Sequence, residues 1–493
     1  MKYLKYIAII LIGNVFFSCS DFLEPEPSSS ITTDNYYTTA AELETGLMGV
    51  YAAVQGINDY DKDANHGVQY EFYVTEMRSD NTSTKSPDSE DASDAGQLES
   101  FNILPTNNFV GNYYSSYFQV IYRANVILGN IGVVDDATKA LAIEAEAKFL
   151  RAYAYFNLVR LFGDLPLVDR VISPAETEIQ FTRVDKSLIY DLIVSDLKTA
   201  ITGGLSTTYK TRATKAAAQG LLAKVYLTIG TAENYTNAQL LCEDIINSKK
   251  FSLKADFHDV FYTEGSLNTE VIFAIGFNSN VQDNSQLFSS EWMNAVGRTS
   301  GVNYATTDVV AAIDAHGGNR IATSYRADPL TVLGGGTVRY QVAKYFPDGA
   351  DGGNDGKTFT GLPRLAGNDW IVLRYADILL MHTEAIMGSA TETSNSNAID
   401  SFMEVKKRAG FILAADRPSP LKKADLLLER RVEFAFENHR MFDLIRFGAA
   451  QEKLSAFATV NNFNYTSTDL LLPIPQNEIN LSKGVMNQNP GYN

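Results

Sequence analysis

Two stretches of the chain repeat one helical pattern, and this repeat constrains the fold more than any other feature. Each copy has a leucine, a glycine eight residues later, and three small or apolar residues at positions i, i+4 and i+7 of a second helix. The first copy contains Leu222, Gly230, Ala238, Cys242 and Ile245, and the second contains Leu380, Gly388, Ala398, Phe402 and Val405. Helical hairpins of this tetratricopeptide kind bury their apolar faces only by stacking on one another. We therefore expect a helical scaffold, with Cys242 as a core residue rather than a reactive thiol.

Helical periodicity extends over most of the chain outside a loop-rich middle. Predicted helices cover residues 41–54, 109–129, 144–162, 187–201, 213–228, 235–249, 373–387, 398–409, 422–437 and 439–457. Between residues 252 and 369 turn residues and glycines cluster, and only short strands are predicted, at 271–275 and 338–346. The sequence thus predicts a mainly α fold in which tetratricopeptide-like hairpins pack against an irregular, loop-rich half with a few short strands.

The N-terminus carries an export and lipidation signal. Residues 1–5 contain two lysines, residues 6–17 are apolar and uncharged, and Ser18 directly precedes Cys19. This apolar run is too short to cross roughly 30 Å of hydrocarbon, so residues 1–18 predict a cleaved signal peptide rather than a membrane span. Cys19 would then be the acylated first residue of the mature chain, and residues 19–35 its acidic tether. A plain secretion signal with a chance cysteine is the alternative.

The composition excludes several kinds of partner. The formal net charge of −17 argues against nucleic acid, because an acidic body repels phosphate. Only two cysteines are present, so acylation of Cys19 leaves Cys242 without a disulfide partner. The five histidines lie far apart, without a second ligand at metal spacing. The spacing of Asp348, Asp351 and Asp355 does not fit a calcium loop, although it leaves open whether calcium binds there. No metal or cofactor is predicted.

Four strings of the sequence resemble, in the same order, those of the SusD-like (SusD/RagB) outer-membrane lipoproteins. They are FLRAYAYFNLVRLFGDLPLV at 149–168, WIVLRYADILLMHTEA at 370–385, ERRVEFAFENHRMFDLIRFG at 429–448, and LLPIP with QNPGY at 471–475 and 488–492. The resemblance covers essentially the whole mature chain. It implies that residues 36–250 form a tetratricopeptide-like helical half. Residues 251–493 would supply the loop-rich ligand region and the C-terminal helices, interlocked with the first half as one domain.

The resemblance also implies a function. Members of this family are cell-surface lipoproteins that bind oligosaccharides and deliver them to a SusC-like TonB-dependent transporter. We therefore expect a non-catalytic protein of the outer membrane, held by the acylated Cys19, that captures polysaccharide fragments. A related lipoprotein that captures peptides is the second hypothesis, and a surface glycosidase is the third.

One charged stretch, at 429–446, invites a catalytic interpretation. Its charged residues are Glu429, Arg430, Arg431, Glu433, Glu437, Arg440, Asp443 and Arg446. Paired carboxylates carry out glycoside hydrolysis. Opposite charges three and four residues apart also form ion pairs on helices, and arginine suits such pairing inside helical packing. We favour this structural interpretation over catalysis.

Sugar binding requires exposed aromatic rings that stack on pyranose faces, with amides, carboxylates and guanidinium groups around them. Two regions meet this description. Their candidate residues are Tyr70, Tyr73, Arg78, Asp80 and Asn81 in the first, and Trp292, Asn294, Arg298 and Tyr304 in the second. Trp292 fits a sugar platform and a core position equally well, and Tyr70 and Tyr73 also fit a buried helical stripe. Trp370 fits core packing better than ligand binding.

Overall fold

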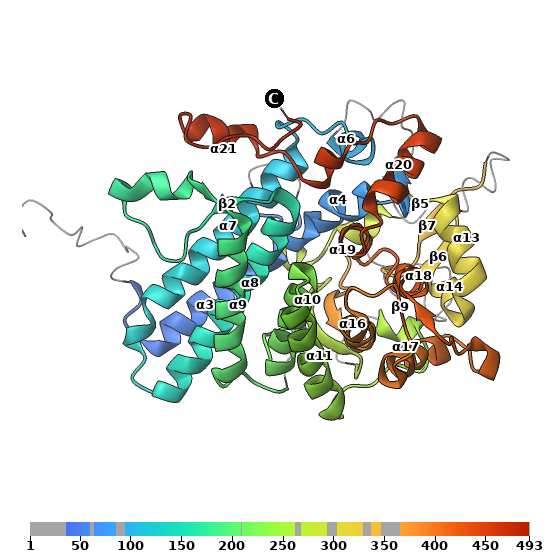
Figure 1. The fold of residues 1–493 in the computed structure, drawn as a ribbon. Helices are drawn as coiled ribbons and strands as arrows, with labels where there is room; N and C mark the ends of the chain where they lie inside the picture. Colours follow the sequence, from blue (N-terminus) through green and yellow to red (C-terminus); the bar gives the residue numbers. More distant parts are fainter. Residues whose placement is uncertain are drawn as a thin grey trace, which may run out of the picture.

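A stack of helical hairpins occupies the left and centre of the molecule (Figure 1). The computed structural model describes residues 36–492 except 60–63, 85–93, 209, 262–267, 293–302, 329–336 and 347–364. In this part of the chain the stacked helices are α3 (Ala40–Gln55), α7 (Asn108–Gly129), α8 (Ala137–Phe162), α9 (Lys186–Thr202), α10 (Lys215–Ile229), α11 (Ala232–Asn247), α16 (Tyr375–Met387) and α17 (Ser396–Arg408). Each packs on the next in this order, which gives the hairpins α3–α7, α8–α9, α10–α11 and α16–α17.

The two repeat copies form the hairpins α10–α11 and α16–α17. Helix α10 ends at Gly230, whose φ of 74° and ψ of 24° lie in the left-handed region, and its N–H donates to the Tyr226 carbonyl at 2.9 Å. Thr231 then caps α11 by accepting from the Asn234 N–H at 3.2 Å. Gly388, with φ of 56°, ends α16. The predicted core positions are buried in both copies: Leu222, Ala238, Cys242, Ile245, Leu380, Ala398, Phe402 and Val405. The predicted helical-hairpin fold is confirmed.

Replacing Gly230 with alanine should lower the free energy of unfolding by about 1 kcal/mol, because a Cβ strains the left-handed backbone. The nearest atom to that Cβ is Tyr235 Oη at 3.4 Å, so strain rather than collision sets the cost. Gly49→Ala is the matched control. Apart from the neighbouring backbone of α3 itself, no atom lies within 4 Å of a Cβ at this position, and alanine should stabilise the protein by roughly 0.5–1 kcal/mol. Urea unfolding measures the change in the free energy of unfolding for each variant. Changes of the same sign in the two variants would contradict this account.

The irregular half contains a four-stranded antiparallel sheet with strand order β1–β5–β7–β6. Its strands are β1 (Thr82–Thr84), β5 (Asn303–Ala305), β6 (Tyr325–Ala327) and β7 (Tyr340–Val342). Ala305 lies opposite both Thr82 and Tyr340, so the sheet joins segments far apart in the sequence. The predicted strand at 271–275 is β4 (Val271–Ile275), which pairs with β8 (Trp370–Arg374). The predicted strand at 338–346 is reduced to β7.

The C-terminal helices are shorter than the sequence pattern predicts. The helix predicted at 422–437 is α18 (Lys423–Glu433), because Phe436 and Asn438 adopt left-handed φ values of 69° and 62°. The buried carboxylate of Glu76 accepts the N–H groups of both residues, at 3.3 and 3.1 Å, and so stabilises this turn. The helix predicted at 439–457 is divided into α19 (Arg440–Arg446) and α20 (Ala450–Asn461) around Gly448, whose φ is 72°.

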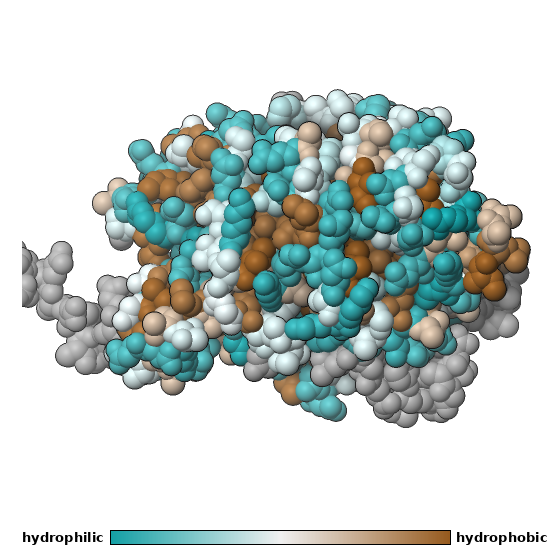
Figure 2. All heavy atoms as spheres, turned by 60° about the horizontal axis from the view of Figure 1, so that its bottom comes forward, coloured by the Kyte–Doolittle hydropathy of each residue, from teal (hydrophilic) through white to brown (hydrophobic). Residues whose placement is uncertain are grey.

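One large hydrophobic cluster runs through both halves. Phe149 of α8, for example, packs edge-to-face on Phe273 of β4, with ring centroids 5.0 Å apart. Helix α20 belongs to a separate, smaller cluster that contains Phe101, Met441, Leu444, Ala450, Leu454, Phe457 and Ala458. No helix among the described residues is long and apolar enough to span a bilayer. On the face drawn in Figure 2, apolar side chains reach the surface in separate groups among hydrophilic ones.

Candidate functional site

A groove of about 580 Å³ lies where the four-stranded sheet meets α20 and the start of α13 (Thr307–His316). These elements lie in the upper right of Figure 1. The residues that line it are Asp80, Ser83, Thr84, Tyr304, Ala305, Thr306, Thr307, Asp308, Thr337, Val338, Arg339, Tyr340, Arg431, Lys453, Ala456, Phe457, Val460 and Asn461. Its volume is in the range of sites that bind small ligands, roughly 300–1,000 Å³.

Two tyrosines of adjacent strands line the groove. Tyr304 lies in β5 opposite Ser83, and the guanidinium carbon of Arg339 is 5.3 Å from its ring centroid. Tyr340 lies in β7, half-buried, and its ring packs edge-to-face on Tyr325 at 5.3 Å. Packing of this kind fixes the orientation of the Tyr340 ring. Tyr304 is only 4% exposed, so Tyr340 is the tyrosine ring that the sheet presents to the groove.

A ladder of alternating charges connects the groove to the interior. The exposed carboxylate of Asp308 accepts from Arg431 Nη2 at 2.7 Å. Arg431 is itself held by Asn81 Oδ1 at 2.9 Å and by Asp80 Oδ2 at 3.2 Å. Arg440 donates twice to Asp80, at 2.7 Å each. Burial by itself would raise the pKa of Asp80, but the hydrogen bonds from Arg440 and the charges of Arg431 and Arg440 lower it below its ordinary value. The ladder therefore links the exposed Asp308 to the buried Asp80 through Arg431.

Helix α20 forms the opposite wall with both apolar and polar side chains. Val460 and Phe457 contribute apolar surface, and Lys453 and Asn461 contribute hydrogen-bonding groups. A wall of this composition offers an apolar face and polar edges to a ligand, which is the combination that a sugar ring requires.

An interior cavity between the hairpin stack and the C-terminal helices is a poor candidate for a ligand. Its volume is about 50 Å³, and its lining includes Glu71, Arg160, Lys224, His439 and Asp443. This is far below the roughly 300 Å³ of a small-ligand pocket, although it is large enough for ordered water.

Trp292 does not form the exposed platform that its sequence context suggested. It is only 1% exposed, because its ring packs among Phe72, Phe288 and Tyr345 at centroid distances of 5.2, 6.0 and 5.5 Å. Trp370 belongs to the same aromatic core, 5.3 Å from Phe288, as its predicted packing role requires. A buried ring cannot stack on a sugar, so the core alternative for Trp292 is correct in this structure.

Tyr70 and Tyr73 are also buried, which corrects their assignment as sugar platforms. The ring of Tyr70 stacks on His66 at 4.0 Å, and that of Tyr73 stacks on Phe109 at 3.8 Å. The two tyrosines contact each other edge-to-face at 5.5 Å. They form the buried stripe that the sequence allowed as the alternative.

The polar candidates fall into three groups. Arg78 is fully buried and donates to the Asp469 carbonyl at 2.6 Å, so it contacts no ligand. Asn81 lies behind the groove, where it holds Arg431 and donates to Glu76 Oε1 at 3.0 Å. Of the candidate residues proposed from sequence, Asp80 and Tyr304 line the groove in the described part of the chain, and both are buried. Asn294 and Arg298 lie outside the described residues, as do Cys19 and the aspartates at 348, 351 and 355.

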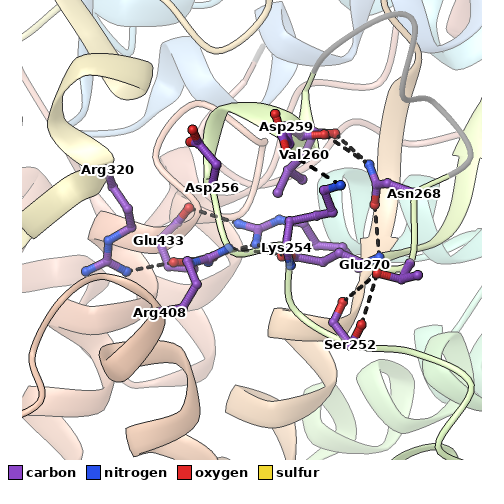
Figure 3. A network of polar contacts seen from close by, with 12 residues as sticks. Ser252, Lys254, Asp256, Asp259, Val260, Asn268, Glu270, Arg320, Arg408 and Glu433 are labelled. Carbon is purple, nitrogen blue, oxygen red and sulfur yellow. Dashed lines mark hydrogen bonds and ion pairs between the residues drawn. The ribbon is translucent and has the colours of Figure 1, made fainter.

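The charged stretch at 429–446 forms ion pairs, but mostly with other elements rather than along its own helices. Glu433 accepts from Arg320 at 2.6 Å, from Arg374 at 2.5 Å and from Arg408. Figure 3 shows Arg320 and Arg408 directed at Glu433 from different elements. Only the pair of Arg446 with Asp443, 2.7 Å apart, has helical spacing within this stretch. The structural interpretation of these charges is confirmed, although their partners differ from those the spacing predicted.

Comparison with known proteins gives consistent matches along the chain. The family described as "Starch-binding associating with outer membrane" matches residues 21–227, and the family described as "SusD family" matches residues 294–492. SusD-like protein P2 of Formosa agariphila is 25% identical over 536 residues and covers 100% of both chains. A SusD-like protein of Bacteroides ovatus is 25% identical and covers 90% of this chain and 82% of its own length.

Solved structures match over a similar extent. A laminarin-binding SusD-like protein is 26% identical, with a TM-score of 0.74 over 92% of this chain and 100% of the other. Surface glycan-binding protein A of Bacteroides thetaiotaomicron, in complex with laminarihexaose, is 21% identical with a TM-score of 0.75 over 92% of this chain and 100% of the other, a likeness of fold. The hairpin stack, the consecutive family matches and the full-length relatives agree, and the chain belongs to the SusD-like family.

Proposed function

We propose that this protein binds glycans at the cell surface and that the groove between β7 and α20 is the binding site. It is anchored to the outer membrane through the acylated Cys19, and it delivers oligosaccharides to a SusC-like TonB-dependent transporter. The groove itself is the observation that carries the proposal, because it combines aromatic, apolar and hydrogen-bonding side chains in a suitable volume. The similarity to a laminarin-binding SusD-like protein supports the ligand class.

The binding mode follows from the lining. Tyr340, which is half-buried, provides ring surface for the C–H face of a pyranose, whereas Tyr304 is only 4% exposed and packs in the sheet. Asp308 accepts hydrogen bonds from sugar hydroxyls, and the neighbouring Arg431 keeps its carboxylate oriented. A site that is already organised before the ligand arrives costs little conformational entropy on binding.

The carboxylates that line the groove fit a binding role better than glycoside hydrolysis. Glycoside hydrolysis needs two carboxyl groups, one of them a proton donor with a raised pKa. The described groove lining contains two carboxylates, Asp80 and Asp308. Asp80 is held by two arginines that lower its pKa, so it is a poor proton donor.

The mature chain should bind at least one neutral or acidic polysaccharide in affinity electrophoresis against laminarin, starch, xylan and pectin. In calorimetry with oligosaccharides of the bound glycan, Tyr340→Ala should weaken binding about tenfold, because it removes one stacking ring. Tyr122→Ala is the matched control, since this tyrosine is 50% exposed on α7, away from the groove, and binding should be unchanged.

Binding to none of the four polysaccharides would contradict glycan capture, and equal losses in the two tyrosine variants would contradict the assigned groove. Release of reducing sugar by the pure protein would favour the glycosidase hypothesis. Binding of a peptide library in place of glycans would favour peptide capture.

A further inference from the structure

A buried carboxylate without a charged partner lies behind the groove. Glu76 belongs to the short 3₁₀ helix Glu76–Arg78 that precedes β1, and its side chain is buried. Within the described part of the chain Glu76 forms no ion pair, and it accepts from the Asn81 amide and from two backbone N–H groups. The buried carboxylates of Asp80 and Glu437, by contrast, each pair with an arginine, at 2.7 and 2.8 Å. A buried charge without a counter-ion is costly, so its presence calls for a functional explanation.

The side chain of Asn81 connects Glu76 to the groove. Its Nδ2 donates to Glu76 Oε1 at 3.0 Å, and its Oδ1 accepts from Arg431 Nε at 2.9 Å. A carboxylate can only accept and a guanidinium can only donate, so a single orientation of the amide satisfies both neighbours. Arg431 lines the groove and donates in turn to Asp308 at 2.7 Å. An ionised Glu76 therefore determines which atom of the Asn81 amide faces Arg431.

The backbone of the same segment holds a second part of the groove. The Thr306 N–H donates to the Asn81 carbonyl at 2.9 Å, and the Thr306 hydroxyl donates to the Asp80 carbonyl at 3.0 Å. Thr306 lines the groove and is the N-cap of α13, and Asp308 lies in the first turn of that helix. Asn81 is therefore connected to Asp308 by two routes, through Arg431 and through the start of α13.

We propose that Glu76 is a positioning residue of the groove, because it orients Asn81, which in turn holds Arg431 and Asp308 where a glycan contacts them. The inference rests on the proposed function of the groove and concerns how the same site is organised. A protonated Glu76 would present an O–H donor and weaker acceptors, so it would no longer select one orientation of the Asn81 amide. The affinity for glycan should therefore depend on the charge of Glu76.

The charge of Glu76 changes in the neutral pH range. Burial raises the pKa of Glu76 from 4.5 to about 7, although the hydrogen bonds from Asn81, Phe436 and Asn438 and the charge of Lys344 act in the opposite direction. Glu76 is therefore ionised above about pH 7 and protonated below it, and the groove should bind glycan more weakly as the pH falls. The described lining of the groove contains no histidine, the side chain that ordinarily titrates in this range.

Other titratable groups surround Glu76. On the elements packed around it they are Glu71 of α4 (Glu71–Val74), Glu99 of α6 (Asp94–Glu99), Arg431 of α18, Arg440 of α19, and Lys344 and Tyr345 of the segment after β7. Both arginines stay cationic, and burial raises the pKa of Tyr345, which stays neutral. Burial lowers the pKa of Lys344 to about 8, so Lys344 remains mostly charged below about pH 7.5. Burial also raises the pKa of Glu71, so a test must separate Glu71 from Glu76.

The test is calorimetry of the mature chain with an oligosaccharide of whichever of laminarin, starch, xylan and pectin binds in affinity electrophoresis. From about pH 7.5 to about pH 5.5 the affinity of the wild type should fall about fivefold, the effect expected for one hydrogen bond. Glu76→Gln and Asn81→Ala should each weaken binding at the higher pH by a similar factor and remove the pH dependence. Glu71→Gln is the matched control. It neutralises the other buried carboxylate, to which Asn438 Nδ2 donates at 3.4 Å, and should leave the affinity and its pH dependence unchanged.

Equal affinity of the wild type at the two pH values would overturn the inference and leave glycan binding in place. So would a pH dependence that persists in Glu76→Gln or disappears in Glu71→Gln. Crystal structures of the wild type and of Asn81→Ala without glycan give a readout that needs neither binding nor a folded Glu76→Gln. Arg431 and Asp308 should move in the variant, and an unchanged pair would overturn the inference. Loss of binding in Tyr340→Ala is measured separately, so the proposed function and this inference can fail independently.

Discussion

Glu433→Gln should lower the free energy of unfolding by about 3–5 kcal/mol, the usual cost of removing one member of a buried ion cluster. Glu433 is fully buried and accepts from three arginines of three different elements, Arg320, Arg374 and Arg408. Burial by itself would raise the pKa of Glu433, but the charges of the arginines hold it well below its ordinary value. Glutamine has nearly the same volume as glutamate but no charge. The three buried arginines would therefore lose one of the negative charges that balance them.

The matched control is Glu452→Gln on α20. The side chain of Glu452 is 78% exposed and pairs with its neighbour Lys453, so its replacement should leave the free energy of unfolding nearly unchanged. Urea unfolding of both variants, followed by circular dichroism, gives the comparison. Similar small decreases in the free energy of unfolding of the two variants would show that the ion cluster of Figure 3 does not stabilise the packing of β8, α17 and α18.

His439 should make the protein sensitive to acid. Its ring stacks on Phe434 at 4.6 Å, and burial together with the positive charge of Lys224 lowers its pKa from 6.5 to about 3. The folded state therefore keeps this histidine neutral where the unfolded chain would protonate it. The stability that this provides is complete above pH 6.5 and is lost as the pH falls toward about 3.

Between about pH 7 and pH 4, the wild type should lose about 3 kcal/mol more stability than His439→Gln, which cannot titrate. The variant itself is less stable at neutral pH, because the ring stack is gone, so the comparison is of the two pH slopes. Urea unfolding at several pH values supplies both slopes. Parallel slopes would contradict the assignment of this acid sensitivity to His439.

The sequence predicts the helical scaffold well because each hairpin is a local structure. The spacing of Gly230 from Leu222, and of Gly388 from Leu380, repeats within short windows, and the same spacing determines which residues are buried. The ends of the C-terminal helices are harder to predict from the sequence. The turn at Phe436 depends on the carboxylate of Glu76, which lies far away in the chain.

The binding site is harder to predict, because its residues meet only through tertiary contacts. Tyr340, Asp308 and Arg431 come from β7, α13 and α18, and none has unusual neighbours in sequence. The sequence places Arg431 in a helical pattern of charges and gives no sign that it lines a groove. Trp292 and Tyr73 had a suitable polar context, but distant rings such as Phe72 and Phe109 cover them. Outside the helical hairpins, whether an aromatic ring is exposed depends on contacts between residues far apart in the sequence. Local sequence therefore does not distinguish a sugar platform from a core residue.

A crystal structure of the mature chain soaked with laminarihexaose, or with a hexasaccharide of whichever glycan binds in affinity electrophoresis, tests the central claim most directly. We expect sugar density between β7 and α20, with one pyranose face on Tyr340 and a hydroxyl within hydrogen-bonding distance of Asp308. Ordered sugar at another surface, with this groove empty, would contradict the account.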